Sequence, residues 1–322
     1  MERLGAGWVN RELLVTGLAI RTFGEDEAGE IYIGAEDGTI LHLVGGTAPR
    51  LNSTAVTNAA SYVTGLSPGS LATAFASGVL DSPGVLGADR IPLPLSLQGV
   101  SITVDGIAAP ILSLSNVNGR EQINFQVPFE ISKRTSASVV AARAGASSGA
   151  VVIPVFEIQP AVYTSDGTRA IVLHNADFSF ANAGRPLVPG ESAAVYAAGL
   201  GPVANQPPNG AAASSSPLPA TLNPVALTLA GLPCEVQFAG LAPGFVGVYQ
   251  VNFRVPANAP RGSQDMVLTA GAGTKQGENP GLGVTLKAPL LCLLIRVHRR
   301  SSAAKIFLRS SHPMPQHKIG RR

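Results

Sequence analysis

The segment that most resembles a catalytic motif is Gly145-Ala-Ser147-Ser-Gly149, which fits the GxSxG pattern of a nucleophile elbow. That pattern requires a strained turn from a strand into a helix, because the turn exposes the serine hydroxyl to a base. Here the β-like runs ASVVAARA and AVVIPVF flank the motif, so no helix follows it. We interpret the segment as a hairpin turn and predict no catalytic residue in this chain.

Candidate metal ligands do not converge in the sequence. Glu25, Asp26 and Glu27 offer carboxylate oxygens of the kind that calcium prefers. The same acidic run is typical of a solvated loop, which we favour, so we predict no metal site. No spacing of His, Cys and Asp matches a zinc site. The five histidines are an isolated His174, His42 within an alternating apolar run, and His298, His312 and His317 near the carboxy terminus.

Charge and cysteine usage exclude several further functions. Residues 288–322 hold eight of the 23 Lys and Arg and no Asp or Glu, which leaves 15 basic against 20 acidic residues in the rest of the chain. A mildly acidic body with five Tyr and one Trp lacks the basic stripe and the stacking platforms of nucleic-acid-binding proteins. Cys234 and Cys292 lie in unlike segments and suggest no disulfide framework. The basic tail, with Arg299-Arg300, could contact anionic lipid or nucleic acid, but we favour a disordered extension.

An internal repeat shows which elements surround these residues. PGSLATAFASG at 68–78 matches PGESAAVYAAG at 189–199, GVSITVDG at 99–106 matches PVALTLAG at 224–231, and QINFQVP at 122–128 matches QVNFRVP at 250–256. The offsets grow slowly from 121 to 125 to 128, as expected for a duplicated domain with small loop insertions. The repeated unit therefore defines the architecture.

Apolar residues alternate with polar ones within the repeated segments, for example at Val100, Ile102 and Val104. A period of two indicates half-buried strands, and Asp105-Gly106 and Ala230-Gly231 predict hairpin turns after them. With 36 Gly, 25 Pro and no helical stripe, we predict an all-β chain with two tandem immunoglobulin-like β-sandwiches, at residues 54–158 and 159–287.

Two connecting segments are polar and turn-rich. Residues 201–219, GPVANQPPNGAAASSSPLP, predict a long exposed loop and a candidate contact surface. Residues 46–53 form a linker before the first copy, and the sequon Asn52-Ser-Thr54 within it is assigned no function. Among the aromatic residues, Tyr196, Tyr249, Phe125 and Phe253 follow the core pattern, and Phe129 and Phe245 are the plausible exposed candidates for carbohydrate contact.

The repeated region resembles a known family. Asn58-Ala-Ala-Ser61, EQINFQVP in the first copy, and AGLGP with FAGLAPGFVGVYQVNFRVP in the second resemble a C-terminal domain family expanded in Acidobacteria, over about residues 55–287. Members are similar to tandem immunoglobulin-like domains appended to secreted or surface proteins, with no assigned chemistry. The resemblance implies an extracellular, periplasmic or cell-surface location, although the amino terminus, with Glu2, shows no signal peptide.

The first 45 residues contain a second resemblance. LLVTGLAIRTFGEDEAGEIYIGAEDGTILHLV is similar to the last blade of a glucose/sorbosone-type sugar dehydrogenase, a propeller that uses pyrroloquinoline quinone. Ile31 and Ile33 precede Asp37-Gly38, and Leu41 follows it, which predicts a hairpin with a type I′ turn. The family's cofactor-binding residues lie in earlier blades, so the resemblance assigns no quinone, calcium or catalytic residue to this chain. About 40 residues do not form an independent core, so we interpret residues 1–45 as a blade remnant.

Two functions follow as alternatives. The first is a non-catalytic interaction or spacer module of an exported or cell-surface bacterial protein, with a protein or glycan surface as partner. The second is a carboxy-terminal fragment of a quinone-dependent sugar dehydrogenase whose catalytic blades are missing. Carbohydrate binding by the sandwiches is a third and weaker possibility. The longest apolar run near the end, Leu290 to Ile295, is too short to span a bilayer.

Overall fold

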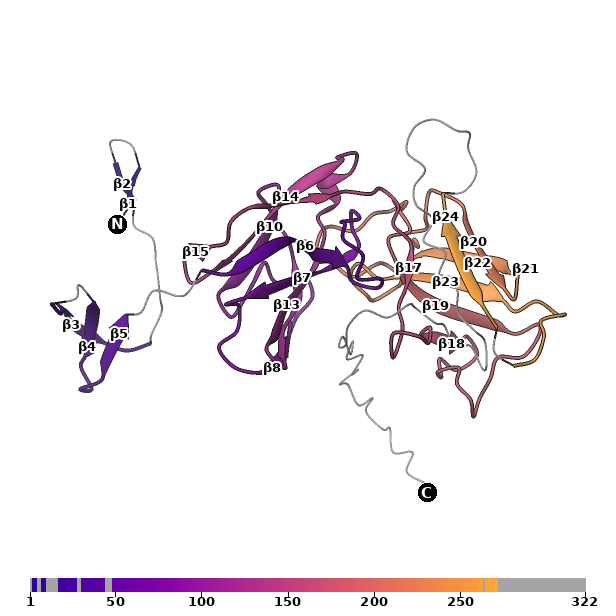
Figure 1. Ribbon diagram of the computed structural model, residues 1–322, viewed down its shortest axis with the longest axis horizontal. Helices are drawn as coiled ribbons and strands as arrows, with labels where there is room; N and C mark the ends of the chain where they lie inside the picture. The colour runs from indigo at the N-terminus through magenta and orange to yellow at the C-terminus, as the bar shows by residue number, and fades with distance from the viewer. Residues whose placement is uncertain are drawn as a thin grey trace, which may run out of the picture.

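The computed structural model describes residues 2–4, 7–9, 17–27, 30–43, 48–262 and 264–271. Within these residues the chain consists of β-strands and one 3-10 turn, η1 (Phe129–Ile131). The predicted all-β, immunoglobulin-like fold is confirmed, because two pairs of antiparallel sheets each enclose their own core. Figure 1 shows the first sandwich in indigo to magenta beside the second in magenta to orange. No helix in this part of the chain is long and apolar enough to cross a membrane.

The first sandwich has a five-stranded sheet of order β6-β7-β13-β12-β8. Its second sheet has the order β11-β10-β14-β15, with β16 paired to β14 and β9 paired to β10. The strands are β6 (Arg50–Asn58), β7 (Leu71–Ser77), β8 (Gly84–Gly87), β9 (Ser96–Leu97), β10 (Val100–Val104), β11 (Ile107–Ala108), β12 (Ile111–Val117), β13 (Arg120–Gln126), β14 (Ser136–Arg143), β15 (Ala146–Ser147) and β16 (Val151–Pro154).

The second sandwich repeats this plan with fewer strands. Its sheets have the orders β17-β19-β23-β22, with β18 on β19, and β21-β20-β24. The neighbours β19-β23-β22 correspond to β7-β13-β12, and β21-β20-β24 correspond to β11-β10-β14. The strands are β17 (Ala161–Val162), β18 (Val172–His174), β19 (Ser192–Ala198), β20 (Val225–Leu229), β21 (Leu232–Pro233), β22 (Glu235–Leu241), β23 (Tyr249–Arg254) and β24 (Met266–Ala270).

The predicted alternation of buried and exposed side chains is confirmed in the repeated strands. Val100, Ile102 and Val104 are fully buried, whereas their neighbours Ser101 and Thr103 are half-buried. The second copy follows the same pattern in β23. Each sandwich therefore buries one face of each sheet in its own cluster of apolar residues.

The predicted hairpin turns at Asp105-Gly106 and Ala230-Gly231 have the expected geometry. Asp105 and Gly106 have φ values of 50° and 77°, and Ala230 and Gly231 have φ values of 53° and 76°. Both central residues of each turn thus adopt the left-handed conformation that a type I′ turn requires. The hairpins β10–β11 and β20–β21 follow directly from these turns.

The third turn, at Asp37-Gly38, is a hairpin turn of another type. Only Gly38 has a positive φ, of 86°, and its N–H donates to the Ala35 oxygen at 3.2 Å. The Asp37 carboxylate accepts the Thr39 N–H at 2.9 Å. This is a type I turn with glycine at the left-handed position, so the predicted type I′ turn is wrong although the hairpin is confirmed.

Two small sheets precede the sandwiches. β1 (Glu2–Leu4) pairs with β2 (Gly7–Val9), and β3 (Ile20–Glu25), β4 (Ile31–Ala35) and β5 (Ile40–Leu43) form a three-stranded antiparallel sheet. The register aligns Phe23, Ile33 and Leu41 on one face of this sheet. Ile33 is buried, yet Phe23 is 66% exposed. This face is therefore apolar and only partly covered.

The hydroxyl group of Tyr249 provides a test of the second core. Tyr249 is fully buried, and its hydroxyl donates to the Gly201 oxygen at 2.6 Å. Tyr249→Phe keeps the ring but leaves that carbonyl without its partner, so we expect the free energy of unfolding to fall by about 1–2 kcal/mol. Chemical denaturation of both proteins measures this difference. An unchanged midpoint and slope would contradict the assigned hydrogen bond.

Candidate functional site

The GxSxG segment forms a hairpin, as predicted. β14 and β15 pair through Ala142–Ser147 and Arg143–Ala146, and the turn residues Ala144 and Gly145 have φ values of 48° and 86°. Ser147 itself lies in β15, so it does not occupy a turn from a strand into a helix. The neighbouring Ser148 hydroxyl donates to the Gly149 oxygen at 2.9 Å and accepts the Ala141 N–H at 3.1 Å. Local backbone contacts therefore account for this serine pair.

The acidic run and the histidines are likewise held by local contacts. The Asp26 carboxylate accepts the Glu30 N–H at 3.0 Å and the Tyr32 hydroxyl at 3.3 Å. The ring of His42 stacks on Tyr32 at 4.6 Å, and its Nε2 lies 2.7 Å from Glu30 Oε2. Among the described residues no three His, Cys, Asp or Glu side chains gather to hold a metal ion. Cys292, His298, His312, His317 and the pair Arg299-Arg300 lie outside the described residues.

His174 has a partner that the sequence does not indicate. The side chain is buried, its Nδ1 contacts the Glu191 carboxylate, and its Nε2 lies 3.2 Å from the Arg185 oxygen. Arg185 also hydrogen-bonds Asp177, which lowers the pKa of that exposed carboxyl to about 2. These contacts tie the loop after β18 to the start of β19. His174 stands alone in the sequence, because Glu191 is 17 positions away and the pairing of β18 with β19 brings the two together.

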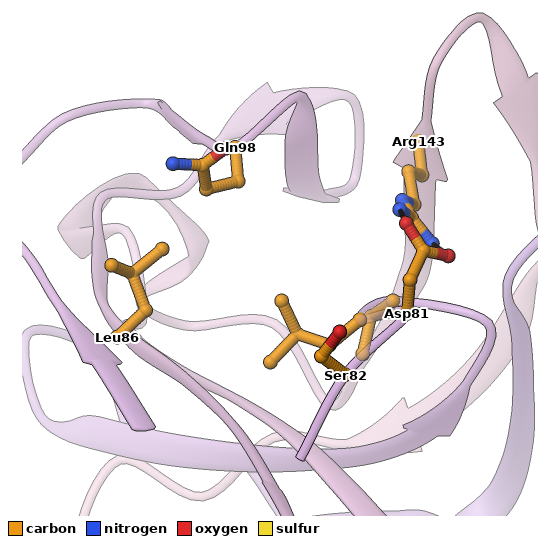
Figure 2. A pocket seen from close by; sticks show the side chains of 7 residues that line it. Asp81, Ser82, Leu86, Gln98 and Arg143 are labelled. Atoms are coloured by element: carbon orange, nitrogen blue, oxygen red, sulfur yellow. Dashed lines mark hydrogen bonds and ion pairs between the residues drawn. The ribbon is translucent and has the colours of Figure 1, made fainter. Parts of the chain in front are cut away.

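One pocket lies at the edge of the first sandwich (Figure 2). It has a volume of about 240 Å³ and is lined by Val79, Leu80, Asp81, Ser82, Leu86, Gln98 and Arg143. Figure 2 shows the Asp81 carboxylate turned toward the Arg143 guanidinium, and one of their two contacts measures 2.8 Å. Hydrogen bonds from Arg143 lower the pKa of Asp81. The two charges in the pocket satisfy each other, and the volume is below the roughly 300 Å³ of a small-molecule site.

Cys234 is the one cysteine in the described residues, and it is a free thiol. It packs against the core of the second sandwich. Burial disfavours the thiolate and raises the pKa of Cys234 to about 12. Because the thiolate is the nucleophilic form, the protonated thiol is a weak nucleophile near neutral pH.

The two sandwiches approach each other closely where Ser70 and Asn58 of the first meet Gly199 and Gln159 of the second. The Gly199 N–H donates to the Ser70 hydroxyl at 2.8 Å, and the Gly199 oxygen accepts the Gln159 N–H at 2.8 Å. The Asn58 amide donates to the Gln159 oxygen at 3.0 Å. A Cβ at Gly199 would lie 2.1 Å from that oxygen, so only glycine permits this approach. Ser70 and Asn58 of the first sandwich are thus held by hydrogen bonds against Gly199 and Gln159 of the second.

Phe129 extends this junction into the second core. The residue lies in η1, which follows β13 of the first sandwich, yet it is buried within the apolar cluster of the second sandwich. Its ring also lies against Gly69, where a Cβ would come within 1.9 Å of Phe129 Cε1. The prediction that Phe129 is exposed is wrong. Its flanking Pro128 and Glu130 give no indication of the contact, because the partner residues belong to the other copy.

The predicted loop 201–219 provides the other side of the junction. The Asn209 amide donates to both Glu130 carboxylate oxygens, at 3.0 and 2.7 Å, and its oxygen accepts the Phe129 N–H at 3.2 Å. The Gly210 N–H donates to Gln126 Oε1 at 2.6 Å. The loop thus contacts the first sandwich of the same chain, and its role as a contact surface for a partner stays a prediction. Full exposure of the loop is wrong, because Gly210 is buried against the first sandwich.

The aromatic residues divide between core and surface. Phe125, Tyr249 and Phe253 are fully buried, as predicted. Tyr196 does not lie in the core between the sheets, because it pairs with Gln250 on the outer face, where it is half-buried and packs against a small apolar cluster that includes Leu71 and Tyr163. Its ring centroid lies 5.8 Å from that of Phe245, which is partly exposed as predicted.

No protein-family model matches the chain, and no curated protein matches it. Among solved structures, the chain is similar to a protein of the mixed-linkage glucan utilization locus of Bacteroides ovatus in complex with a mixed-linkage heptasaccharide. That match has 16% identity and a TM-score of 0.32, over 81% of this chain and 51% of that protein, so the chain spans about half its length. A tandem from titin matches at 10% identity and a TM-score of 0.19, over 77% and 71% of the two chains. Similarity at this level has no bearing on the function.

Truncation of Phe129 tests the shared core. Phe129→Ala leaves a cavity within the second sandwich and removes the ring that packs on Gly69, so we expect the free energy of unfolding to fall by about 3–5 kcal/mol. Phe178→Ala is the matched control, because Phe178 is 72% exposed, and we expect a change within about 0.5 kcal/mol. Urea denaturation measures both. Equal effects of the two substitutions would rule out the burial of Phe129 between the sandwiches.

Proposed function

We propose that this chain is a non-catalytic interaction and spacer module of an exported or cell-surface bacterial protein. The observation that supports this role most strongly is the junction between the sandwiches. The Gly199 N–H of the second unit donates to the Ser70 hydroxyl of the first at 2.8 Å, the Asn58 amide of the first donates to the Gln159 oxygen of the second at 3.0 Å, and Phe129 of one unit packs in the core of the other. A joint of this kind fixes the distance and angle between two domains, which a flexible linker does not.

The chemistry of the described side chains is compatible with a role that does not involve catalysis. The Ser147 segment is a hairpin, the charges of the pocket satisfy each other, and the Cys234 thiol is protonated near neutral pH. Each of these groups is used in packing or in a local ion pair. The module's function would therefore lie in the surfaces that the fixed pair of sandwiches presents.

The fixed geometry is testable by distance measurement. Val152→Cys and Leu222→Cys place spin labels at exposed positions of the two sandwiches, 63% and 64% exposed, in a background with Cys234→Ser and Cys292→Ser. We expect pulsed electron paramagnetic resonance to give one narrow distribution of the distance between the two labels. Phe129→Ala combined with Asn209→Ala removes the ring and the amide from the junction and should broaden the distribution. A broad distribution before these two changes would contradict the spacer role.

A second candidate is that the chain belongs to a quinone-dependent sugar dehydrogenase of the glucose/sorbosone type. The face of β3–β5 that contains Phe23 and Ile31 supports it, because these side chains are 66% and 41% exposed. Propeller blades pack such faces against neighbouring blades. The residues present do not fit a quinone or calcium site, because their polar groups contact one another. The Asp26 carboxylate accepts the Tyr32 hydroxyl and the Glu30 N–H. The His42 ring stacks on Tyr32 and contacts the Glu30 carboxylate. In this alternative the catalytic residues would belong to other blades.

The size of the native polypeptide distinguishes the two candidates. Immunoprecipitation from the source cells followed by mass spectrometry identifies the terminal peptides and the mass. The second candidate predicts a species much larger than 32.9 kDa, with peptides from upstream blades and quinone-dependent glucose oxidation. A product of 32.9 kDa that starts at Met1 and shows no glucose oxidation with added quinone and calcium would contradict it.

A further inference from the structure

The outer face of the sheet β19-β23-β22 bears two partly exposed aromatic side chains, Tyr196 and Phe238, and the ring of Phe245, from the connection between β22 and β23, lies beside Tyr196. Pairing places Tyr196 opposite Gln250 and Phe238 opposite Asn252, so both rings lie on the face turned away from the core. A Cβ at Gly240 would lie 2.7 Å from Phe238 Cζ, which indicates that the Phe238 ring lies over this glycine. We call the surface formed by Tyr196, Phe238, Phe245, Gln250 and Asn252 the aromatic face.

Two amide groups lie between these rings. Gln250 Nε2 donates to Asn252 Oδ1 at 2.7 Å. The other polar atoms of the pair, Gln250 Oε1 and Asn252 Nδ2, make no further hydrogen bond within the part of the chain that the structure describes. The aromatic face therefore offers one acceptor and one donor beside the rings.

The equivalent asparagine of the first sandwich is used differently. Asn124 accepts the Thr73 hydroxyl at 2.7 Å and donates to the Ser113 hydroxyl at 3.0 Å. In the second sandwich the residues opposite Asn252 are Ala194 and Phe238. Both hydroxyl partners are thus replaced by apolar groups, while the asparagine remains. Both polar groups of Asn124 are thus used within the sheet, whereas Asn252 keeps only the hydrogen bond that its oxygen accepts from Gln250, which leaves its Nδ2 group available to a ligand.

The charges on this sheet limit the kind of ligand. The segments of β19, β22 and β23 contain one acidic and one basic residue, Glu235 and Arg254. These two pair with each other at 3.2 Å, at the end of the face away from Tyr196. The rings and amides are therefore uncharged as a group, which matches a neutral ligand and not an acidic or basic one.

We propose that the aromatic face binds an uncharged polysaccharide. A sugar ring has an apolar C–H face that packs on an aromatic ring, and its hydroxyl groups both donate and accept hydrogen bonds. Tyr196, Phe238 and Phe245 supply the rings, and Gln250 and Asn252 supply the acceptor and the donor. This proposal rests on the role as an interaction module and names the partner of its second sandwich.

Affinity electrophoresis tests the proposal with the full chain. The protein is run in native gels that contain soluble mixed-linkage β-glucan, xyloglucan or galactomannan, with polygalacturonate as the acidic comparison. We expect at least one neutral polymer to retard the protein and polygalacturonate to have no effect. Tyr196→Ala should weaken binding by about tenfold, the factor expected for the loss of one stacking contact. Asn252→Ala should weaken it as well, without removing any ring.

Phe75→Ala is the matched control, because Phe75 occupies the position in the first sandwich that is 121 residues before Tyr196. We expect this variant to be retarded as the unaltered protein is. Unaltered migration of the wild-type protein with all three neutral polymers would overturn the proposal, as would equal losses in Phe75→Ala and Tyr196→Ala. Thermal unfolding of each variant separates loss of binding from loss of folding. The distance measurement between the sandwiches is independent of this result, so a failure here leaves the spacer role standing.

Discussion

The contact on which the rest of the arrangement depends is the packing of Phe129 across the junction. Phe129 lies in a single 3-10 turn of the first sandwich, and its ring is buried among the apolar residues of the second. Gly69 makes this possible, because a side chain at that position would collide with the Phe129 ring. Burial of a phenyl ring contributes about 1.5–3 kcal/mol, so separation of the domains would expose a costly apolar surface. The two cores are therefore coupled, although each sandwich has its own sheets.

The repeated segments were the most informative part of the sequence. Their period of two correctly predicted the strands around Val100–Val104 and Tyr249–Arg254, and glycine after Asp105 and Ala230 correctly predicted two hairpins. These features depend on local conformational preferences and on burial of one face, both of which a sequence displays directly. The turn at Asp37-Gly38 was assigned the wrong type, because only Gly38 adopts a positive φ, and Asp37 instead accepts the Thr39 N–H with its carboxylate.

The errors about Phe129 and Tyr196 and the unforeseen partner of His174 share one cause. Each residue owes its environment to a partner from another part of the fold: Gly69 beside Phe129, Gln250 beside Tyr196, and Glu191 beside His174. The alternation of apolar residues along a strand shows which face is buried, but it does not show which other residues pack on each face. Comparison of the two copies would have helped with Tyr196, because the alternation places its equivalent Phe75 opposite Gln122 on the polar face of the sheet. The junction offered no such internal comparison, since it joins unlike ends of the two copies.

The difference between the two copies at the junction also limits how such units can be joined in series. The joint uses Gln126, Phe129 and Glu130 of the first copy. At the corresponding positions, 128 residues later, the second copy has Arg254, Ala257 and Asn258. A third sandwich that approached the second in the same head-to-tail manner would meet a methyl group where a phenyl ring is required, and a cation where an amide acceptor is required. Duplication thus produced a joint that closes once, so that this surface pairs two domains without propagating into a filament.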